Sequence, residues 1–341
     1  MEYPEQHSEI PEPAAATHNG ENHPYPPKFS LPEGKESPWL KSLISLGAYL
    51  LLGYYIFPGY KILLLITAIV LIHEMGHFLA MKYFRYSELG IFFIPLLGAY
   101  VSGSKREVSQ LQSAIILLAG PLPGILIGAA LYLADTYLGP LYLLDIPYTR
   151  IAWLFILLNL INLLPVYPLD GGQLLNRVFL DEESIWSRAF ILLSVAALAW
   201  FSFSMYRSTG NHFYFILLFF PVMIFLRSMG DRKLVSLEKK IEEAGINADT
   251  EYEDLPDADY WRIRDILVQE HPSFSDLQAG PPYSYSGKEE KVMLTIQSLL
   301  HRHLIQDLSL AGKLLVFLLW AAGIATPWLL DMDLSFFSRF R

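Results

Sequence analysis

Long apolar segments are the feature of this sequence that most restricts its fold. An α-helix needs about 20 predominantly apolar residues to cross a bilayer, and seven segments come close to that length. They lie at 38–57, 60–83, 111–134, 150–168, 185–204, 212–228 and 311–330. Only 17% of the 341 residues are charged, against about 25% in soluble domains. The sequence therefore predicts an all-α, polytopic membrane protein with about seven transmembrane helices.

The basic residues of the short loops indicate how these helices are oriented. Loops on one side of the predicted membrane domain carry more Lys and Arg than loops on the other, and the richest one holds Lys82, Arg85, Lys105 and Arg106. Because short cytoplasmic loops are enriched in basic residues, we predict a cytoplasmic N-terminus. Since no organelle-targeting segment is apparent, we expect a multi-pass protein of the bacterial cytoplasmic (inner) membrane.

Polar segments divide the chain into four parts. Residues 1–36 are acidic and rich in Pro, which predicts a disordered N-terminal tail. Residues 37–228 hold six of the apolar segments and form the predicted membrane-embedded core. Residues 229–309 are polar with helical periodicity, so we expect a small cytoplasmic helical segment. Residues 310–341 supply the last transmembrane helix and a short tail.

Helical signals recur within the polar segment 229–309. One predicted helix ends at Gly245, and another carries Met293, Ile296, Leu300 and Leu304 at amphipathic spacing. We find no Gly-rich phosphate loop and no internal repeat. The pattern therefore predicts structure here without assigning a role.

A stretch after the second apolar segment is apolar but too short and too interrupted to span a membrane. Its β-favouring pieces, Ile91–Ile94 and Ala99–Val101, flank Pro95 and Gly98, which predicts a β-hairpin at about 88–103. Non-helical backbone at membrane depth must be covered by protein or line a wet cavity. We therefore expect the hairpin at the membrane face.

Three polar side chains, His73, Glu74 and His77, interrupt the second apolar segment near its C-terminal end. Residues four apart in a helix share one face, so both imidazoles can reach one metal ion while Glu74 lies beside it. Ionisable groups in a membrane are costly, roughly 2.5–3.5 kcal/mol for an Asp at a helix centre, and usually functional. The pattern predicts a metal site, and a purely structural polar cluster is the alternative.

The two histidines need a third protein ligand to form a catalytic zinc site. Since the chain contains no cysteine, the ligand must be His, Asp or Glu. Asp170 is the candidate, because Pro165 and Pro168 break the fourth helix just before it and its predicted depth matches that of His77. We predict one Zn²⁺ per chain. Two histidines and one carboxylate also suit iron, but a base at Glu74 favours hydrolysis.

Together, the two motifs resemble those of the site-2 protease family of intramembrane zinc metalloproteases. The family pattern HExxH appears here as residues 73–77 and NxxPxxxLDG as residues 162–171, with every fixed position matched. The resemblance covers about residues 60–228. It implies zinc ligands at His73, His77 and Asp170, and a catalytic base at Glu74.

The function that the resemblance implies is cleavage of a transmembrane segment in membrane-protein substrates, by regulated intramembrane proteolysis within the lipid bilayer. The active site would lie near the cytoplasmic face. Asn162 is implied to hold the substrate backbone or the oxyanion, and a simple cap of a broken helix is an equal alternative for it. Asn159, one turn earlier, is interpreted as an interhelical hydrogen-bonding residue.

The predicted hairpin and a glycine-rich segment also resemble family features. The stretch Gly98, Ala99, Tyr100 and Val101 is similar to the hairpin that the family is thought to use to hold substrate as an added strand, and a plain structural hairpin is the alternative. The glycines of LAGPLPGILIG, spaced by four, are interpreted as a smooth face for close helix packing.

Other functional classes are less consistent with the sequence. A non-catalytic, zinc-containing membrane scaffold that binds helices would be marked by a degenerate motif, whereas Glu74 and all three ligands are present. A zinc transporter would need polar residues along several helices, and the first, fifth and sixth show almost none. The net charge of -9 and the lack of a basic stripe argue against a nucleic-acid partner. The pattern does not specify the oligomeric state.

Overall fold

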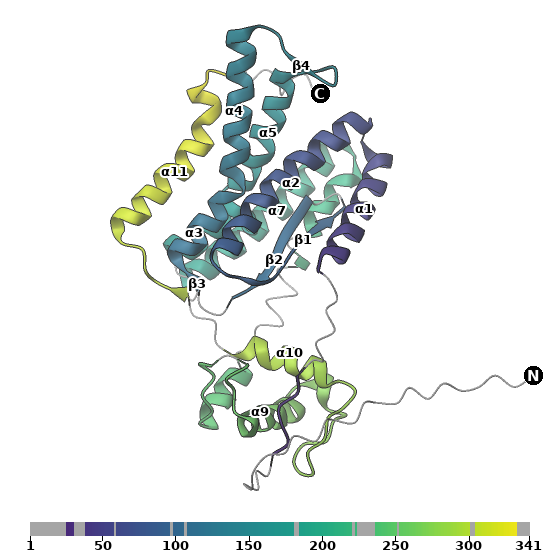
Figure 1. Cartoon of the computed structure of the whole chain (residues 1–341), viewed down its shortest axis with the longest axis vertical. Coiled ribbons are helices and arrows are strands. Elements are labelled where there is room, and N and C mark those ends of the chain that lie inside the picture. Colours follow the sequence, from purple (N-terminus) through teal and green to yellow (C-terminus); the bar gives the residue numbers. More distant parts are fainter. Residues whose placement is uncertain are drawn as a thin grey trace, which may run out of the picture.

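The computed structural model describes residues 25–30, 38–57, 59–95, 98–105, 108–180, 184–219, 222–223, 236–250, 252–300 and 304–332. Helices dominate this part of the chain. Figure 1 shows a bundle of long helices and, below it, a smaller unit that contains α9 and α10.

Five helices in the described residues are long and apolar enough to cross a membrane. They are α1 (Pro38–Ile56), α2 (Tyr60–Tyr83), the consecutive α3 (Gln110–Ala119) and α4 (Pro121–Leu138) taken together, α7 (Ile185–Thr209) and α11 (Leu310–Leu329). Many of their large apolar side chains are exposed, as contact with lipid requires. A sixth apolar helix, α5 (Tyr148–Leu163), has only 16 residues. The fold is that of a mostly helical, multi-pass membrane protein, and the predicted count of seven spans is not confirmed.

The segment predicted as the sixth span begins differently from a membrane helix. α7 ends at Thr209 and is followed by Gly210, whose φ of 69° turns the chain. Residues His212–Leu218 form the 3₁₀-helix η2. η2 packs back on α7, where the Ser202 hydroxyl donates to the Tyr214 carbonyl (2.7 Å) and the rings of Tyr206 and Phe215 lie 4.6 Å apart. Residues 220–221 and 224–228 of the predicted span lie outside the described residues.

The predicted hairpin is present as a small two-stranded sheet. Strands β1 (Ser87–Ile94) and β2 (Gly98–Ser104) are antiparallel, with Ile94 opposite Gly98 and Ile91 opposite Val101. α1 covers β1, because the Phe93 N–H donates to the Ser45 hydroxyl oxygen (3.1 Å) and Ile91 and Phe93 join the buried cluster between α1 and α2. Among the described residues β1 is the only strand paired with β2, so the outer edge of β2 has no strand partner there.

A second, shorter hairpin joins α4 to α5 and was not predicted. β4 (Tyr142–Leu143) pairs with β5 (Ile146–Pro147), and strands of two residues show no alternating pattern in a sequence. The Asp145 carboxylate of its turn lies 2.6 Å from the Lys61 ammonium at the start of α2. The hairpin thereby ties the start of α5 to the start of the helix that carries the two histidines.

After the smaller unit, the chain returns to the bundle and completes it. β6 (Leu304–Ile305) pairs in parallel with β3 (Val108–Ser109), and the Asp307 carboxylate accepts a hydrogen bond from the Leu111 N–H at the start of α3 (3.0 Å). α11 then packs along α3, α4 and α5. The placement of Leu304 on an amphipathic helix is therefore wrong: α10 ends at Leu299, the backbone of Leu300 is extended, and Leu304 lies in β6.

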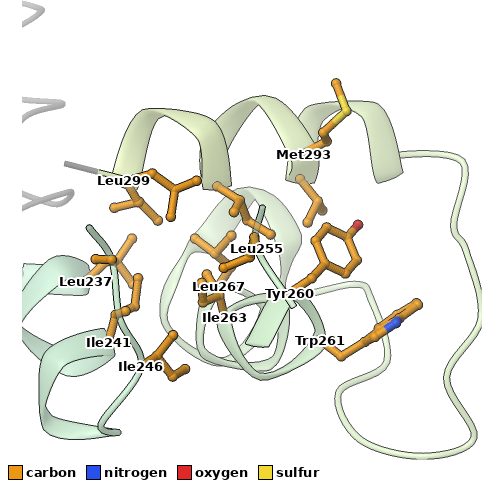
Figure 2. Close-up of a cluster of buried hydrophobic side chains, with 14 of the residues drawn as sticks. Leu237, Ile241, Ile246, Leu255, Tyr260, Trp261, Ile263, Leu267, Met293 and Leu299 are labelled. Atoms are coloured by element: carbon orange, nitrogen blue, oxygen red, sulfur yellow. The ribbon is translucent and has the colours of Figure 1, made fainter. Parts of the chain in front are cut away.

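The smaller unit has its own hydrophobic core. It contains a helical stretch at 236–243, α9 (Asp257–Glu270), the 3₁₀-helix η3 (Pro272–Phe274) and α10 (Glu289–Leu299). Figure 2 shows the buried side chains, among them Ile241, Ile263 and Leu299, gathered between these helices. The first helical stretch ends at Gly245, as predicted, where φ is 69°.

The prediction of a disordered N-terminal tail is wrong for residues 25–30. These residues pack against the smaller unit, and several hydrogen bonds connect them to residues 252–285. Composition does not reveal this contact, because the partners lie more than 200 positions away in the sequence. The other residues of the predicted tail lie outside the described residues.

Candidate active site

The polar face of α2 is buried against protein and does not face lipid. His73, Glu74 and His77 are 5%, 6% and 8% exposed, because α3, α4 and α5 pack on this side of α2. The His73 Nδ1 lies 2.8 Å from the Asn159 side-chain oxygen on α5, and the His77 Nδ1 lies 2.8 Å from the Ile116 carbonyl oxygen on α3. Each imidazole is therefore oriented by a neighbouring helix.

These two contacts determine the tautomers of the neutral histidines. A carbonyl oxygen only accepts hydrogen bonds, so each Nδ1 carries the proton and donates it. Each Nε2 then presents a lone pair. The two Nε2 atoms lie 3.1 Å apart, so two lone pairs face each other inside the bundle.

Asp170 reaches the same point from the end of α5. α5 ends at Leu163, and the chain folds back tightly, since a Cβ on Gly171 would lie 2.0 Å from the Leu163 carbonyl oxygen. Asp170 is the first residue of the short helix α6 (Asp170–Leu174), which continues as the π-helix η1 (Leu175–Leu180). Its Oδ2 lies 3.1 Å from the His73 Nε2 and 3.3 Å from the His77 Nε2. The structure thus brings together the three predicted ligands.

A divalent cation fits the centre of this triangle. The Asp170 Oδ2 is buried and has no hydrogen-bond donor within the part of the chain that the structure describes, although an unpartnered buried carboxylate oxygen is costly. Ligand atoms about 2.0–2.1 Å from a tetrahedral zinc lie roughly 3.3 Å from one another. The three measured separations of 3.1–3.3 Å agree with that spacing, and two imidazoles with one carboxylate are ordinary zinc ligands.

Two of the glycines interpreted as a packing face make room for the site itself. A Cβ on Gly120 would lie 2.3 Å from the His77 Nε2, and a Cβ on Gly124 would lie 2.2 Å from the Asn159 Nδ2. Any side chain at these positions would displace a histidine or the residue that orients one. The third glycine of the row, Gly128, packs against Ile156 and the backbone of α5, as the helix-packing interpretation predicts.

The structure gives less direct evidence for a role of the other predicted site residues. Asn162 is half-buried on α5, and no hydrogen bond within the described residues joins its side chain to His73, His77 or Asp170. Gly98, Ala99, Tyr100 and Val101 form the first half of β2, which packs on α2. Their roles remain predictions.

Asn159 forms the interhelical hydrogen bond that was predicted for it, and its partner is His73, which it orients. Its side-chain oxygen accepts from His73 while its amide nitrogen donates to the Phe155 carbonyl (2.7 Å), and the residue is 1% exposed. The outer partner of a ligating histidine sets its tautomer and ring orientation. The available signal was the i, i+3 relation between Asn159 and Asn162, which places both amides near one face of α5.

We predict that Asn159→Leu lowers zinc affinity by about 10–100-fold, the usual effect of removing such a partner. The Asn159→Asp variant keeps an acceptor for the His73 N–H and should retain most of the affinity. Competition with a chromogenic chelator measures both dissociation constants. Equal affinity in wild type and Asn159→Leu would show that His73 needs no orientation from α5.

Comparison with known proteins relates part of the chain to a described family. Residues 61–145 match the family model described as Peptidase family M50. The matched range contains His73, Glu74 and His77 and ends before Asp170, so the third ligand position rests on the second motif and on the structure. The resemblance to the site-2 protease family is confirmed.

The match to each curated relative covers only part of that relative's length. Stage IV sporulation protein FB of Bacillus subtilis is 32% identical over 124 residues, which are 35% of this chain and 40% of that protein. A zinc metalloprotease of Methanocaldococcus jannaschii is 28% identical over 127 residues, which are 36% of this chain and 35% of that protein. The chain therefore spans less than half the length of these curated relatives. The solved structure of a site-2 protease from M. jannaschii matches with a TM-score of 0.41 and 18% identity, covering 54% of this chain and 87% of that one.

Proposed function

We propose that the chain is an intramembrane zinc metalloendopeptidase that cleaves a transmembrane segment of membrane-protein substrates, in regulated intramembrane proteolysis. The observation that carries the proposal is the convergence of the His73 Nε2, the His77 Nε2 and the Asp170 Oδ2 inside a helical membrane bundle, with Glu74 next to His73 on α2. We further propose a bacterial inner membrane, a cytoplasmic N-terminus and a site near the cytoplasmic face.

The proposed chemistry divides between the ion and the side chains. When bound, Zn²⁺ supplies a Lewis acid that polarises a carbonyl and lowers the pKa of a water toward neutrality. His73, His77 and Asp170 hold the ion, and Asn159 and the Ile116 carbonyl keep both imidazoles in the ligating tautomer. Glu74, which lies within electrostatic range of His77, His73 and Asp170, accepts the proton of the attacking water. It then donates that proton to the leaving amine.

Substrate backbone would be held by the edge of the small sheet. A helical peptide bond is shielded by its own hydrogen bonds, so the scissile segment must first be extended. The outer edge of β2 offers unpaired backbone donors and acceptors to an added strand, and residues 98–101 lie on a strand that packs directly on α2. In this proposal Asn162 holds the substrate backbone or the oxyanion from α5.

The alternative of a non-catalytic zinc scaffold is not favoured. A scaffold has no use for an ionisable base beside the metal, yet Glu74 is kept in the membrane core at 6% exposure, where a carboxylate is costly. The rest of the described site is equally compatible with both classes. Cleavage of peptide bonds therefore distinguishes a protease from a scaffold.

Cleavage of model substrates by the purified chain in detergent tests the proposal. We expect cuts within the membrane helix of single-span substrates that contain helix-weakening Gly, Asn or Pro residues, and none in matched substrates with a Leu-only helix. A zinc chelator should abolish cleavage, and added Zn²⁺ should restore it. Mass spectrometry of the products locates the cut. Cleavage that persists in metal-free protein would contradict the assignment.

A further inference from the structure

The smaller unit holds a short proline-containing piece of the same chain. Residues 25–30, Tyr-Pro-Pro-Lys-Phe-Ser, have no regular secondary structure and appear in Figure 1 as the dark purple segment that crosses this unit. The unit supplies all the buried members of its hydrophobic core from residues 237–300, whereas Tyr25 and Phe29 are only partly buried at its edge. The segment therefore packs at the edge of this core and contributes none of its fully buried side chains.

Aromatic donors of the unit recognise the backbone carbonyls of the segment. The Trp261 Nε1 donates to the Pro26 carbonyl (2.7 Å), the Tyr285 hydroxyl donates to the Pro27 carbonyl (2.6 Å), and the Tyr252 hydroxyl donates to the Phe29 carbonyl (2.5 Å). Proline has no N–H and can only accept hydrogen bonds. A surface that offers indole and phenol donors and apolar ring faces is therefore complementary to proline-rich peptides.

A second set of contacts holds the lysine that follows the two prolines. The Lys28 N–H donates to the Asp257 carboxylate (2.8 Å), and its ammonium donates to the carbonyls of Leu255 (2.8 Å) and Glu253. The ammonium also lies 5.7 Å from the centre of the Tyr252 ring. The ammonium is held by two backbone carbonyls and a ring face, and the Asp257 carboxylate lies against the backbone N–H of the same residue. An acidic residue at this position should therefore be rejected.

Stacked rings form the floor of the site. Tyr25 stacks on Tyr283 with ring centres 5.4 Å apart, and Phe29 meets Tyr285 edge-on at 5.6 Å. Tyr285 in turn stacks on Trp261 at 5.9 Å. A phenol is protonated at neutral pH, so the Tyr285 hydroxyl can donate. Burial, together with nearby carboxylates, raises the pKa of Tyr285 further above its ordinary value.

A buried charge pair holds this floor in place. The Arg264 guanidinium lies 5.0 Å from the Trp261 ring, and its Nε lies 2.9 Å from the Glu289 carboxylate. Arg264 and Glu289 are 3% and 1% exposed. A buried ion pair is weak evidence for stability but can specify a unique arrangement, which is what a preformed peptide site requires.

We propose that the unit of residues 236–300 is a binding site for extended Pro-Pro-Lys-aromatic peptides, and that residues 25–29 of the same chain are its resident ligand. The tether keeps the ligand at a high local concentration, so the site is closed to other segments until residues 25–29 leave it.

Binding of a free peptide to the full chain tests the proposal without reference to proteolysis. The probe is a fluorescent peptide of residues 24–30, Pro-Tyr-Pro-Pro-Lys-Phe-Ser, read by anisotropy. The opened variant carries Tyr25→Gly, Pro26→Ser, Pro27→Gly, Lys28→Ser and Phe29→Gly. We expect it to bind the peptide at least tenfold more tightly than wild type does. A peptide with Glu in place of Lys28 should not bind.

Hydroxyl deletions then locate the site. Added to the opened variant, Tyr285→Phe should weaken peptide binding about fivefold, the ordinary effect of deleting one neutral hydrogen bond. Ser275→Ala is the control, because it also deletes a hydroxyl, and that hydroxyl is exposed and donates to the Pro272 carbonyl and not to the segment. Equal peptide affinity in wild type and the opened variant would overturn the proposal. So would loss of the unit's protease resistance in the opened variant, since residues 25–29 would then be part of its core.

A spin label at residue 30 shows directly whether residues 25–29 are bound to the unit. The chain contains no cysteine, so Ser30→Cys, at an exposed position, provides a single labelling site. We expect an immobilised spectrum in an otherwise wild-type chain and a mobile one after Lys28→Glu with Phe29→Ala or after addition of millimolar free peptide. An immobilised spectrum under both conditions would contradict a releasable ligand.

Discussion

Replacing Glu74 with Gln is expected to lower the rate of substrate cleavage by about 10²–10⁴-fold, the usual contribution of a positioned general base, without releasing zinc. Gln has the same size and shape as Glu but cannot take up the proton of the attacking water. The three proposed ligand atoms belong to His73, His77 and Asp170, so the metal should stay. The variant therefore separates loss of the base from loss of the ion.

Two measurements on the same sample check this result: the initial rate of cleavage of a model substrate, and zinc per chain by atomic absorption. Glu243→Gln is a suitable control, because its side chain is 65% exposed and pairs only loosely with Lys239 (3.9 Å). It should leave both quantities unchanged. Wild-type cleavage by Glu74→Gln would remove the base from the mechanism, and loss of zinc would mean that Glu74 acts as a ligand.

The parts of the fold that could be predicted are those with long, uniform patterns. The apolar runs predicted α1, α2 and α11 to within one or two residues, because each helix must be apolar over the thickness of the bilayer. The same reasoning fails at η2, where a short apolar run folds back on α7. It also misses the pairing of β3 with β6, whose partners are separated by almost 200 positions and by the whole of the smaller unit.

In the candidate site, too, features set by local sequence could be predicted, whereas contacts between distant segments could not. His73 and His77 could be paired from helical spacing alone, and the proline-broken end of α5 pointed to Asp170. The interhelical hydrogen bond of Asn159 was predicted, but its partner could not be derived, because a single Asn on an apolar helix has many possible partners and its contact with His73 depends on how α5 packs on α2. The same holds for Gly120, where only the packed structure shows the His77 ring against the missing side chain.

Replacing Asp170 with Asn is expected to abolish both zinc binding and cleavage while leaving the fold intact. The change removes the anionic member of the proposed ligand set, and a neutral amide oxygen is a poor substitute beside two imidazoles. In the metal-free wild type, the Asp170 Oδ2 faces two Nε2 lone pairs at 3.1 and 3.3 Å. The Asn amide N–H can donate to one of these lone pairs, so the metal-free variant should be at least as stable as the metal-free wild type.

Thermal unfolding with and without zinc distinguishes this outcome from simple misfolding. An ion that binds only the folded chain stabilises it by about 2.7 kcal/mol at a concentration of 100 Kd, so the Tm of the wild type should rise with added zinc. The Tm of Asp170→Asn should not respond, whereas Asp276→Asn, at an exposed ion pair with Lys288, should respond like the wild type. If the Tm of Asp170→Asn rose with zinc as much as that of the wild type, the ion would be held by other residues. The convergence of His73, His77 and Asp170 would then be a polar cluster of the membrane core rather than a metal site.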